Sequence, residues 1–186
     1  MGLWLLALGC GGDGVGGSQD NEILLRDYHG LQEDAAWTYR DEESDDDPEE
    51  SDLLRARLVD EERVELRRGA RWTEAEVVGH LEWDLSNGLD LLSWELPGFE
   101  GEDSLRMADF APAHGDRHSS GDWVCTTNGN VAEVDTFYAV FDDLLRFECN
   151  AGEDGQPGGN WDFALGVGLV RYESGEGLVL DLVAPY

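Results

Sequence analysis

The chain of 186 residues contains no lysine, and its twelve basic residues are all arginine. Against them stand 42 acidic residues, which gives a formal net charge of −30 at pH 7. A surface of this charge repels nucleic acid and anionic lipid headgroups, so neither is an expected partner. Two explanations of the missing lysine fit the sequence equally well: adaptation to salty surroundings, and a GC-rich genome that encodes arginine instead.

Long hydrophobic runs are also missing. The apolar run Leu3–Leu8 is far shorter than the about 20 residues that a transmembrane helix needs, and no later segment qualifies. No amphipathic helix of ten residues stands out, and there is no internal repeat of fixed period. A parallel α/β fold, in which such helices alternate with strands, is therefore not expected.

The run Leu3–Leu8 is followed by Gly9 and Cys10, and then by a Gly-rich segment. This arrangement resembles the end of a bacterial lipoprotein signal, in which the chain is cut before the cysteine and the thiol receives a diacylglycerol. The resemblance implies a signal over residues 1–10, a lipid on Cys10 and a flexible tether over residues 11–26. Acyl chains hold such a protein at a membrane, at about 0.8 kcal/mol per buried CH₂ group.

This resemblance places the protein in the bacterial cell envelope, anchored by lipid, with its domain in the periplasm or outside the cell. The alternative is a buried N-terminal strand that contains an ordinary core cysteine. The Gly-rich segment after Cys10 favours the lipoprotein interpretation, because glycine weakens a continuing strand.

Only two further cysteines are present, Cys125 and Cys149. In an oxidising compartment an even pair predicts a disulfide, and closing the loop between them contributes about 3 kcal/mol by the chain-entropy argument. The alternative is two separate reduced cysteines in the core. A zinc site is not expected, because no histidine neighbours either cysteine.

Alternation of apolar and polar residues predicts short strands joined by turns. The clearest examples are Trp37–Arg40, Leu54–Leu58, Val64–Arg67, Trp123–Cys125 and Leu145–Cys149. Together they predict a single, mainly β domain over residues 27–186, built as a curved antiparallel sheet or barrel-like meander with little helix. The tryptophans alternate with polar residues as core strands require, so we expect them in the core rather than in a groove for lipid or sugar.

One hairpin can be predicted in detail. Asn87-Gly88 is a strong signal for a two-residue turn, because both residues tolerate positive φ. A turn there places Trp83 opposite Leu92 and Leu81 opposite Trp94, with all four side chains on one face.

The chain ends in a second predicted hairpin around Ser174–Gly177, which places Leu169 opposite Leu182. Between the two hairpins, Pro97–Asp122 shows no sustained period. We predict a long loop there, with a helical turn near Ser104–Phe110.

Three segments resemble a large group of uncharacterised bacterial exported proteins and lipoproteins, similar to the TapB-like and DUF3108-like domains. They are Tyr28–Arg40, Ala139–Asp143 and the C-terminal block Trp161–Leu182, which contains Gly-Val-Gly-Leu-Val. The resemblance implies a curved antiparallel sheet related to the LolA half-barrel and a location in the cell envelope. The group has no settled activity, so the resemblance implies no catalytic residue.

The best candidate metal ligands are His114, Asp116, His118 and Asp122. The spacing of the two histidines would place both imidazoles on one helical face, but the neighbouring proline and glycine disfavour a helix. We therefore expect a solvated loop without metal. Within the acidic run Asp41–Asp52, Asp45–Glu50 could collect Ca²⁺ but lacks the ligand spacing and central glycine of a calcium loop, so we expect a solvated loop there too.

The expected function is non-catalytic and needs no cofactor: a lipid-anchored envelope protein whose β domain has a binding or structural role. Its expected partners are the membrane, through Cys10, and an apolar ligand or an envelope protein. The alternative is an exported hydrolase that uses the His114–Asp122 loop, with or without a metal. An apolar cavity would favour ligand binding, a cleft joining both histidines to a carboxylate would favour the hydrolase, and a filled interior would leave a structural role.

Overall fold

The computed structural model describes Tyr28, Gly30 and residues 36–41, 53–69, 73–84, 87–96, 99–151 and 156–185. These residues form twelve β-strands and no α-helix, and none of them forms a helix with the length and hydrophobicity needed to cross a bilayer. The strands are β1 (Ala36–Asp41), β2 (Leu53–Leu58), β3 (Arg63–Arg68), β4 (Glu76–Asp84), β5 (Gly88–Leu96), β6 (Phe99–Asp109), β7 (Arg117–Ser120), β8 (Trp123–Asp135), β9 (Val140–Ala151), β10 (Gln156–Ala164), β11 (Gly168–Ser174) and β12 (Val179–Pro185).

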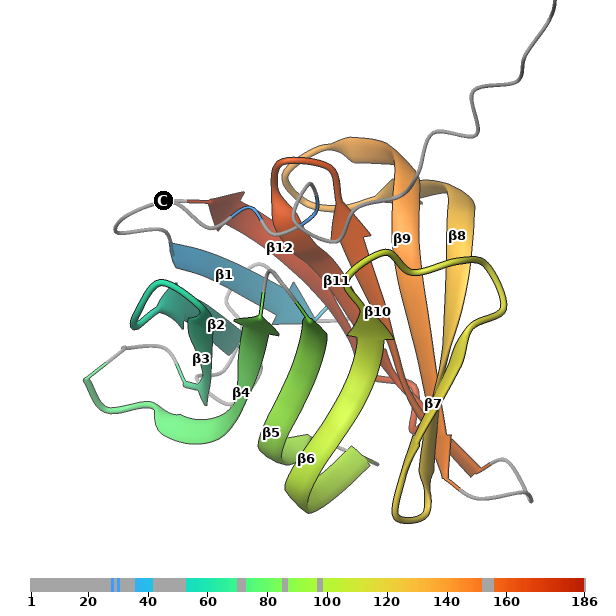
Figure 1. Ribbon diagram of the computed structural model, residues 1–186. Coiled ribbons are helices and arrows are strands. Elements are labelled where there is room, and N and C mark those ends of the chain that lie inside the picture. The colour runs from blue at the N-terminus through green and yellow to red at the C-terminus, as the bar shows by residue number, and fades with distance from the viewer. Residues whose placement is uncertain are drawn as a thin grey trace, which may run out of the picture.

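All twelve strands belong to one antiparallel sheet, in the order β6-β5-β4-β3-β2-β1-β12-β11-β10-β9-β8-β7. The pairing of β1 with β12 joins the N-terminal and C-terminal halves. The sheet curls until its edge strands β6 and β7 approach each other, where Ser120 Oγ donates to the Ser104 carbonyl at 2.5 Å (Figure 1). The result is a nearly closed barrel, so the prediction of a curved antiparallel sheet or barrel-like meander is confirmed.

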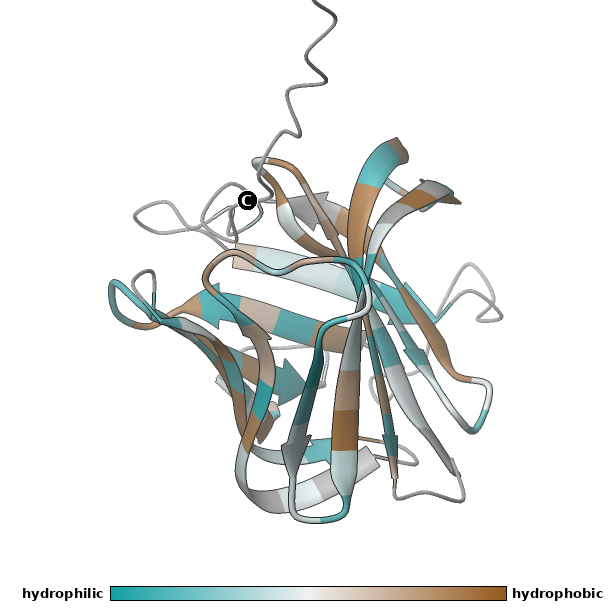
Figure 2. Cartoon of the chain, turned by 45° about the vertical axis from the view of Figure 1, so that its right-hand side comes forward, coloured by the Kyte–Doolittle hydropathy of each residue, from teal (hydrophilic) through white to brown (hydrophobic). Residues whose placement is uncertain are grey.

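Alternate side chains of the strands fill the barrel. In β3, for example, Val64 and Leu66 are buried while Glu65 between them is only partly so, and Figure 2 shows the same alternation of hydrophobic and hydrophilic bands along other strands. Many of the largest buried side chains are aromatic: Trp83, Trp161, Tyr39, Tyr172, Phe147 and Phe163. Several of these rings contact one another, as where Trp83 meets Phe163 edge to face with centroids 5.3 Å apart.

The first predicted hairpin exists as β4 and β5, but its predicted register is wrong. Trp83 lies opposite Leu89 and Leu81 opposite Leu91, three residues from the predicted partners. Both tryptophans of the hairpin are buried as predicted. The face was therefore correct for these rings, while the cross-strand pairs were not.

The physical reason for the shift lies at Gly88. This glycine pairs with Asp84 and opens β5, so it lies in the strand and not at the centre of a two-residue turn. A Cβ at Gly88 would lie 2.1 Å from the Ala108 carbonyl oxygen on β6, so the neighbouring strand requires glycine there. Ser93, with φ of 43°, then interrupts the alternation of β5, which allows Trp94 to be buried as well.

The predicted pairing of Leu169 with Leu182 is wrong by one residue. Arg171 lies opposite Asp181. The predicted pairing would place Arg171 opposite Leu180, which is one residue closer to the turn. The hydroxyl of Ser174 accepts hydrogen bonds from two backbone N–H groups of the turn. This polar side chain helps to set the length of the turn, which the apolar pattern of the strands does not reveal.

The segment Pro97–Asp122 contains β6 and β7, so the prediction of a long loop with a helical turn near Ser104–Phe110 is wrong. In the second half of β6, Leu105, Met107 and Ala108 are fully buried. In the first half, Gly101 interrupts the pattern because a Cβ there would lie 2.3 Å from the Trp94 ring. A tryptophan from the neighbouring strand occupies the space, so β6 lacks an apolar residue where the pattern would need one.

Candidate functional site

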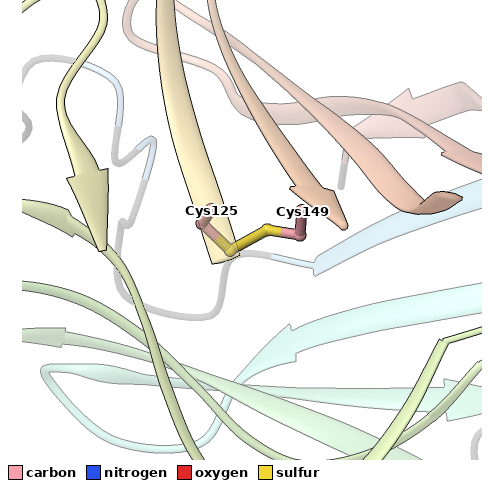
Figure 3. Close-up of a disulfide and its surroundings, with 2 residues drawn as sticks. All are labelled: Cys125 and Cys149. Atoms are coloured by element: carbon pink, nitrogen blue, oxygen red, sulfur yellow. A yellow bond between two sulfur atoms is a disulfide. The ribbon is translucent and has the colours of Figure 1, made fainter. Parts of the chain in front are cut away.

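Cys125 on β8 and Cys149 on β9 lie opposite each other and form the predicted disulfide, with an S–S distance of 2.05 Å (Figure 3). Both residues are fully buried inside the barrel. The bond joins two strands that are already hydrogen-bonded to each other. Its main effect is therefore to restrict the unfolded chain, which contributes about 3 kcal/mol to stability.

Cys10, the predicted lipidation site, and the predicted tether lie outside the described residues, so lipidation stays a prediction. Tyr28 and Gly30, which precede β1, contact the barrel at the end where β10 and β11 are joined. The Tyr28 hydroxyl donates to the Asp143 carbonyl at 3.4 Å. Gly30 lies so close to the Val167 carbonyl that a Cβ would overlap it.

The structure does not bring the candidate metal ligands together. His114 is exposed in the connection between β6 and β7, His118 lies on β7, and Asp122 lies beyond the other end of that strand. The carboxylate of Asp116 accepts a hydrogen bond from the Ala113 N–H at 2.7 Å and so stabilises a turn. Within the part of the chain that the structure describes, no three His, Cys, Asp or Glu side chains are grouped to hold a metal ion.

A polar cluster that the sequence did not predict lies near the barrel seam. Arg106 Nη1 on β6 is 3.4 Å from Asp90 Oδ2 on β5. Burial raises the pKa of the Asp90 carboxyl, the nearby carboxylates Glu82 and Asp84 raise it further, and Arg106 and His118 lower it. The cluster is an ion pair on the barrel wall, and we find no nucleophile and base at hydrogen-bond distance in it.

Charges alternate along one row of five neighbouring strands: Arg146, Asp162, Arg171, Asp181 and Arg40 lie opposite one another in turn. We call this row the charge ladder. Arg146 donates to both carboxylate oxygens of Asp162 at 2.6 and 2.7 Å, and Arg171 to both of Asp181 at 2.5 and 2.7 Å. Both aspartates are buried, so each needs its bidentate arginine.

The connection between β8 and β9, Thr136–Ala139, bends over the barrel end (Figure 1). We call it the tip. The Tyr138 N–H donates to the Leu182 carbonyl on β12 at 3.0 Å. The Thr136 hydroxyl donates to the Ala139 carbonyl at 2.9 Å and accepts from the N–H groups of Tyr138 and Ala139. These bonds hold the backbone of the tip in one conformation.

The charge ladder also holds the tip. Besides Asp181, Arg171 binds the Asp135 carbonyl at 2.8 Å. The guanidinium of Arg40, at the end of the ladder, lies 5.2 Å from the centre of the Phe137 ring. Arg171 lies on β11 and Arg40 on β1, so both contacts bind the tip to strands that are distant from it in the sequence.

Despite these contacts, the tip and the first residue of β9 leave apolar side chains exposed. Phe137 is 48% exposed, Tyr138 52% and Val140 56%. We call these three residues the apolar patch. Leu165, in the turn between β10 and β11 at the same barrel end, is 62% exposed.

The described residues of the barrel interior are closely packed. One apolar cavity between β1–β4 and β10–β11 is lined by residues that include Trp37, Tyr39, Trp83 and Phe163, and its volume is about 10 Å³. That space suits about one water molecule, whereas small-molecule sites occupy about 300–1,000 Å³. Four of the tryptophans are buried, as the strand pattern predicted: Trp37, Trp83, Trp94 and Trp161.

Comparison with protein-family models, with curated proteins and with solved structures finds no match to this chain. The resemblance of the terminal segments to exported bacterial lipoproteins therefore stays a prediction. The geometry of the chain itself has to carry the functional argument.

Two surface features were missed at the level of sequence. The charge ladder could have been found from its alternating signs, but only with the correct strand register. The apolar patch is hidden in the sequence because Phe137, Tyr138 and Val140 resemble the residues of a buried strand. Their exposure results from the way in which β8 and β9 extend past the barrel end.

Proposed function

We propose that this protein is a non-catalytic component of the bacterial cell envelope, held at a membrane by a lipid on Cys10. In this proposal the barrel is a rigid body that acts through its outer surface. The observation that carries the proposal is the close packing of the described residues inside the barrel. Aromatic side chains occupy the barrel, and a cavity of about 10 Å³ has no room for a lipid or another apolar ligand.

Two further observations support a non-catalytic role in an oxidising compartment. The buried disulfide between Cys125 and Cys149 is typical of exported proteins. His114 is exposed and the carboxylate of Asp116 is engaged in a turn, so these two residues give no support to the alternative hydrolase. His118 Nδ1 lies 4.0 Å from Asp109 Oδ1, which pairs a histidine with a carboxylate, but Asp109 is not among the residues of that alternative.

The lipid anchor is tested by intact-mass analysis of the full chain, expressed in a bacterium with a working lipoprotein pathway. We expect the mass of a chain that begins at Cys10 and carries acyl groups, less two hydrogens for the disulfide. The matched control is Cys10→Ser, which keeps the size of the side chain but cannot form the thioether. A correctly started chain without acyl mass would overturn the anchor.

The role of the interior is tested on the same purified protein. We expect organic extraction of the Cys10→Ser chain to release no lipid in stoichiometric amount, because the barrel has no room for one. A reproducible one-to-one lipid would overturn the surface-acting role while leaving the anchor intact. The two experiments therefore test separate parts of the proposal.

A further inference from the structure

We propose that the tip is a preformed docking surface for an envelope protein that offers an apolar socket rimmed by basic side chains. This inference deepens the proposed function and depends on it for location, because the partner must share the compartment. Its starting point is the apolar patch of Phe137, Tyr138 and Val140. Each of these side chains is about half exposed although the backbone that carries them is firmly held.

The first argument is rigidity. Loop tips with exposed apolar side chains are usually free to move, yet here the Thr136 hydroxyl makes three hydrogen bonds within the tip. Tyr138 is bonded to β12, and Asp135 to Arg171 of the charge ladder. A surface fixed in advance loses little conformational freedom on binding, and this favours affinity.

The second argument is the chemistry of the exposed side chains. Tyrosine and phenylalanine provide large contact area with few rotatable bonds and are enriched among the residues that dominate binding energy at interfaces. Phe141 stacks beneath Tyr138, with ring centroids 6.4 Å apart, so the patch continues into the barrel wall. The patch therefore suits a complementary apolar socket.

The third argument is charge, and it selects the occupant. Asp135, Asp142 and Asp143 flank the apolar patch and are exposed; we call them the acidic collar. A basic rim on a partner would complement the collar, which increases the rate of association and excludes wrong partners. A second copy of this chain, with formal charge −30, and an anionic bilayer would both be repelled.

The test uses a photoreactive phenylalanine analogue in the full chain, placed at position 137 and, in a control chain, at Val77. Val77 is 41% exposed at the start of β4, at the opposite end of the barrel. In the producing cells we expect position 137, and not position 77, to cross-link to one envelope protein. Adducts to lipid, adducts to a second copy, or equal products at both positions would overturn the proposal.

The captured protein is then purified and its affinity for the full chain is measured. We expect Phe137→Ser with Tyr138→Ser to weaken binding at least about tenfold, because aromatic anchors dominate such interfaces. Val77→Ser should leave the affinity unchanged. An affinity that does not respond to the two tip substitutions would show that the cross-link was a chance encounter, and would overturn the docking surface.

The basic rim has its own readout. Asn replacing all three collar aspartates should reduce both the affinity and its dependence on salt, while Asp122→Asn at the opposite barrel end should change neither. Salt-independent binding would overturn the charge argument. The proposed function is tested separately. If Cys10 carried no acyl group, the lipid anchor would be overturned, but the affinity between the purified chain and its partner would not change.

Discussion

At the scale of single residues, two buried tyrosines make the stability of the barrel depend on pH in alkaline solution. Burial raises the pKa of the Tyr39 hydroxyl far above its ordinary value of 10.0, and burial together with Glu176 does the same for Tyr172. Above pH 10 the unfolded chain releases these two protons while the folded chain keeps them. The folded state is therefore favoured below that pH, and its stability falls as the pH rises further.

We expect each tyrosine to steepen this loss by about 1.4 kcal/mol per pH unit. Tyr39→Phe and Tyr172→Phe should each reduce the loss of unfolding free energy per pH unit by the contribution of one tyrosine. Denaturant unfolding in a pH series measures this loss. At neutral pH the two variants should differ. The Tyr39 hydroxyl donates to the Leu169 carbonyl at 2.9 Å, so Tyr39→Phe should lower the free energy of unfolding by about 1 kcal/mol. The buried Tyr172 hydroxyl has no hydrogen-bond partner among the described residues, so Tyr172→Phe should leave the free energy of unfolding unchanged. An unchanged slope in both variants would contradict the argument.

A second residue-scale prediction concerns backbone strain. Asp143 has φ of 52°, a region that an L-residue enters at a cost and glycine enters freely. We expect Asp143→Gly to raise the free energy of unfolding by about 0.5–1 kcal/mol. Asp142→Gly is the matched control, since this neighbour is also exposed and loses the same charge but is not among the residues with positive φ.

In the control, glycine only increases the freedom of the unfolded chain, so Asp142→Gly should lower stability by about 0.5–1 kcal/mol. Thermal or denaturant unfolding of the two variants against the parent measures the difference. Equal effects of the two substitutions would show that the conformation of Asp143 carries no strain.

At the scale of elements, the charge ladder makes a prediction about buried ion pairs. Asp162 is fully buried, and Arg146 binds it with two hydrogen bonds while remaining about one-fifth exposed. Removing one partner leaves the other without its counter-charge, so we expect Arg146→Met or Asp162→Leu alone to cost about 2–4 kcal/mol. The double variant should come within about 1 kcal/mol of the parent, because two apolar side chains fill the same space without an uncompensated charge.

The control is the pair formed by Arg63 and Glu82, whose charged atoms are 3.0 Å apart and whose side chains are 44% and 36% exposed. Water already solvates this pair, so either single substitution there should cost less than about 1 kcal/mol. Denaturant unfolding of all variants completes the double-mutant cycle. Additive costs at the buried pair would contradict the ladder's role.

Sequence patterns predicted many of the strands, but neither β6 and β7 nor the alignment of the predicted hairpins. Alternation at Leu81 and Trp83 correctly predicted a hairpin strand with these residues on the core side. The register depended on contacts with a third strand, since Gly88 is needed where β6 passes close by. Likewise, β6 was missed because its position 101 is filled by the Trp94 ring from its neighbour. Such contacts between strands leave no periodic signal in either strand alone.

The candidate site was predictable to a similar degree. The disulfide followed from the number of cysteines and the expected compartment, because its argument needs no geometry. The apolar patch did not follow, because exposure of Phe137 and Tyr138 depends on how far β8 and β9 extend beyond their neighbours. Patterns of local alternation report burial only where a strand lies within the sheet.

At the scale of the whole molecule, the order of the strands explains where the seam of the barrel lies. The first and last strands pair in the middle of the sheet, and the two sheet edges, β6 and β7, follow each other in the chain. The strand pair β8 and β9 next to this seam carries the disulfide. The disulfide therefore lies close to the seam between β6 and β7, where the two edges of the sheet meet without pairing as neighbouring strands.

The net charge of −30 leads to the last prediction. Repulsion among carboxylates is stronger in the compact state than in the expanded unfolded chain, so screening should stabilise the fold. The Debye length falls from about 30 Å at 0.01 M to about 8 Å at 0.15 M salt, and most of the gain should occur in this range. We expect the free energy of unfolding to rise there by at least about 1 kcal/mol, the size of one like-charge contact in water.

Thermal and urea unfolding in a sodium chloride series measure this rise, since urea is uncharged and chloride is only weakly excluded from protein surfaces. A flat or falling curve would show that the carboxylates do not strain the barrel. The shape above 1 M, where the Debye length is only about 3 Å, separates the two explanations of the missing lysine. A plateau fits a genome that encodes arginine in place of lysine, because screening alone is then complete. A continued rise fits adaptation to salt, because it requires counterions that are bound by the folded surface and released on unfolding.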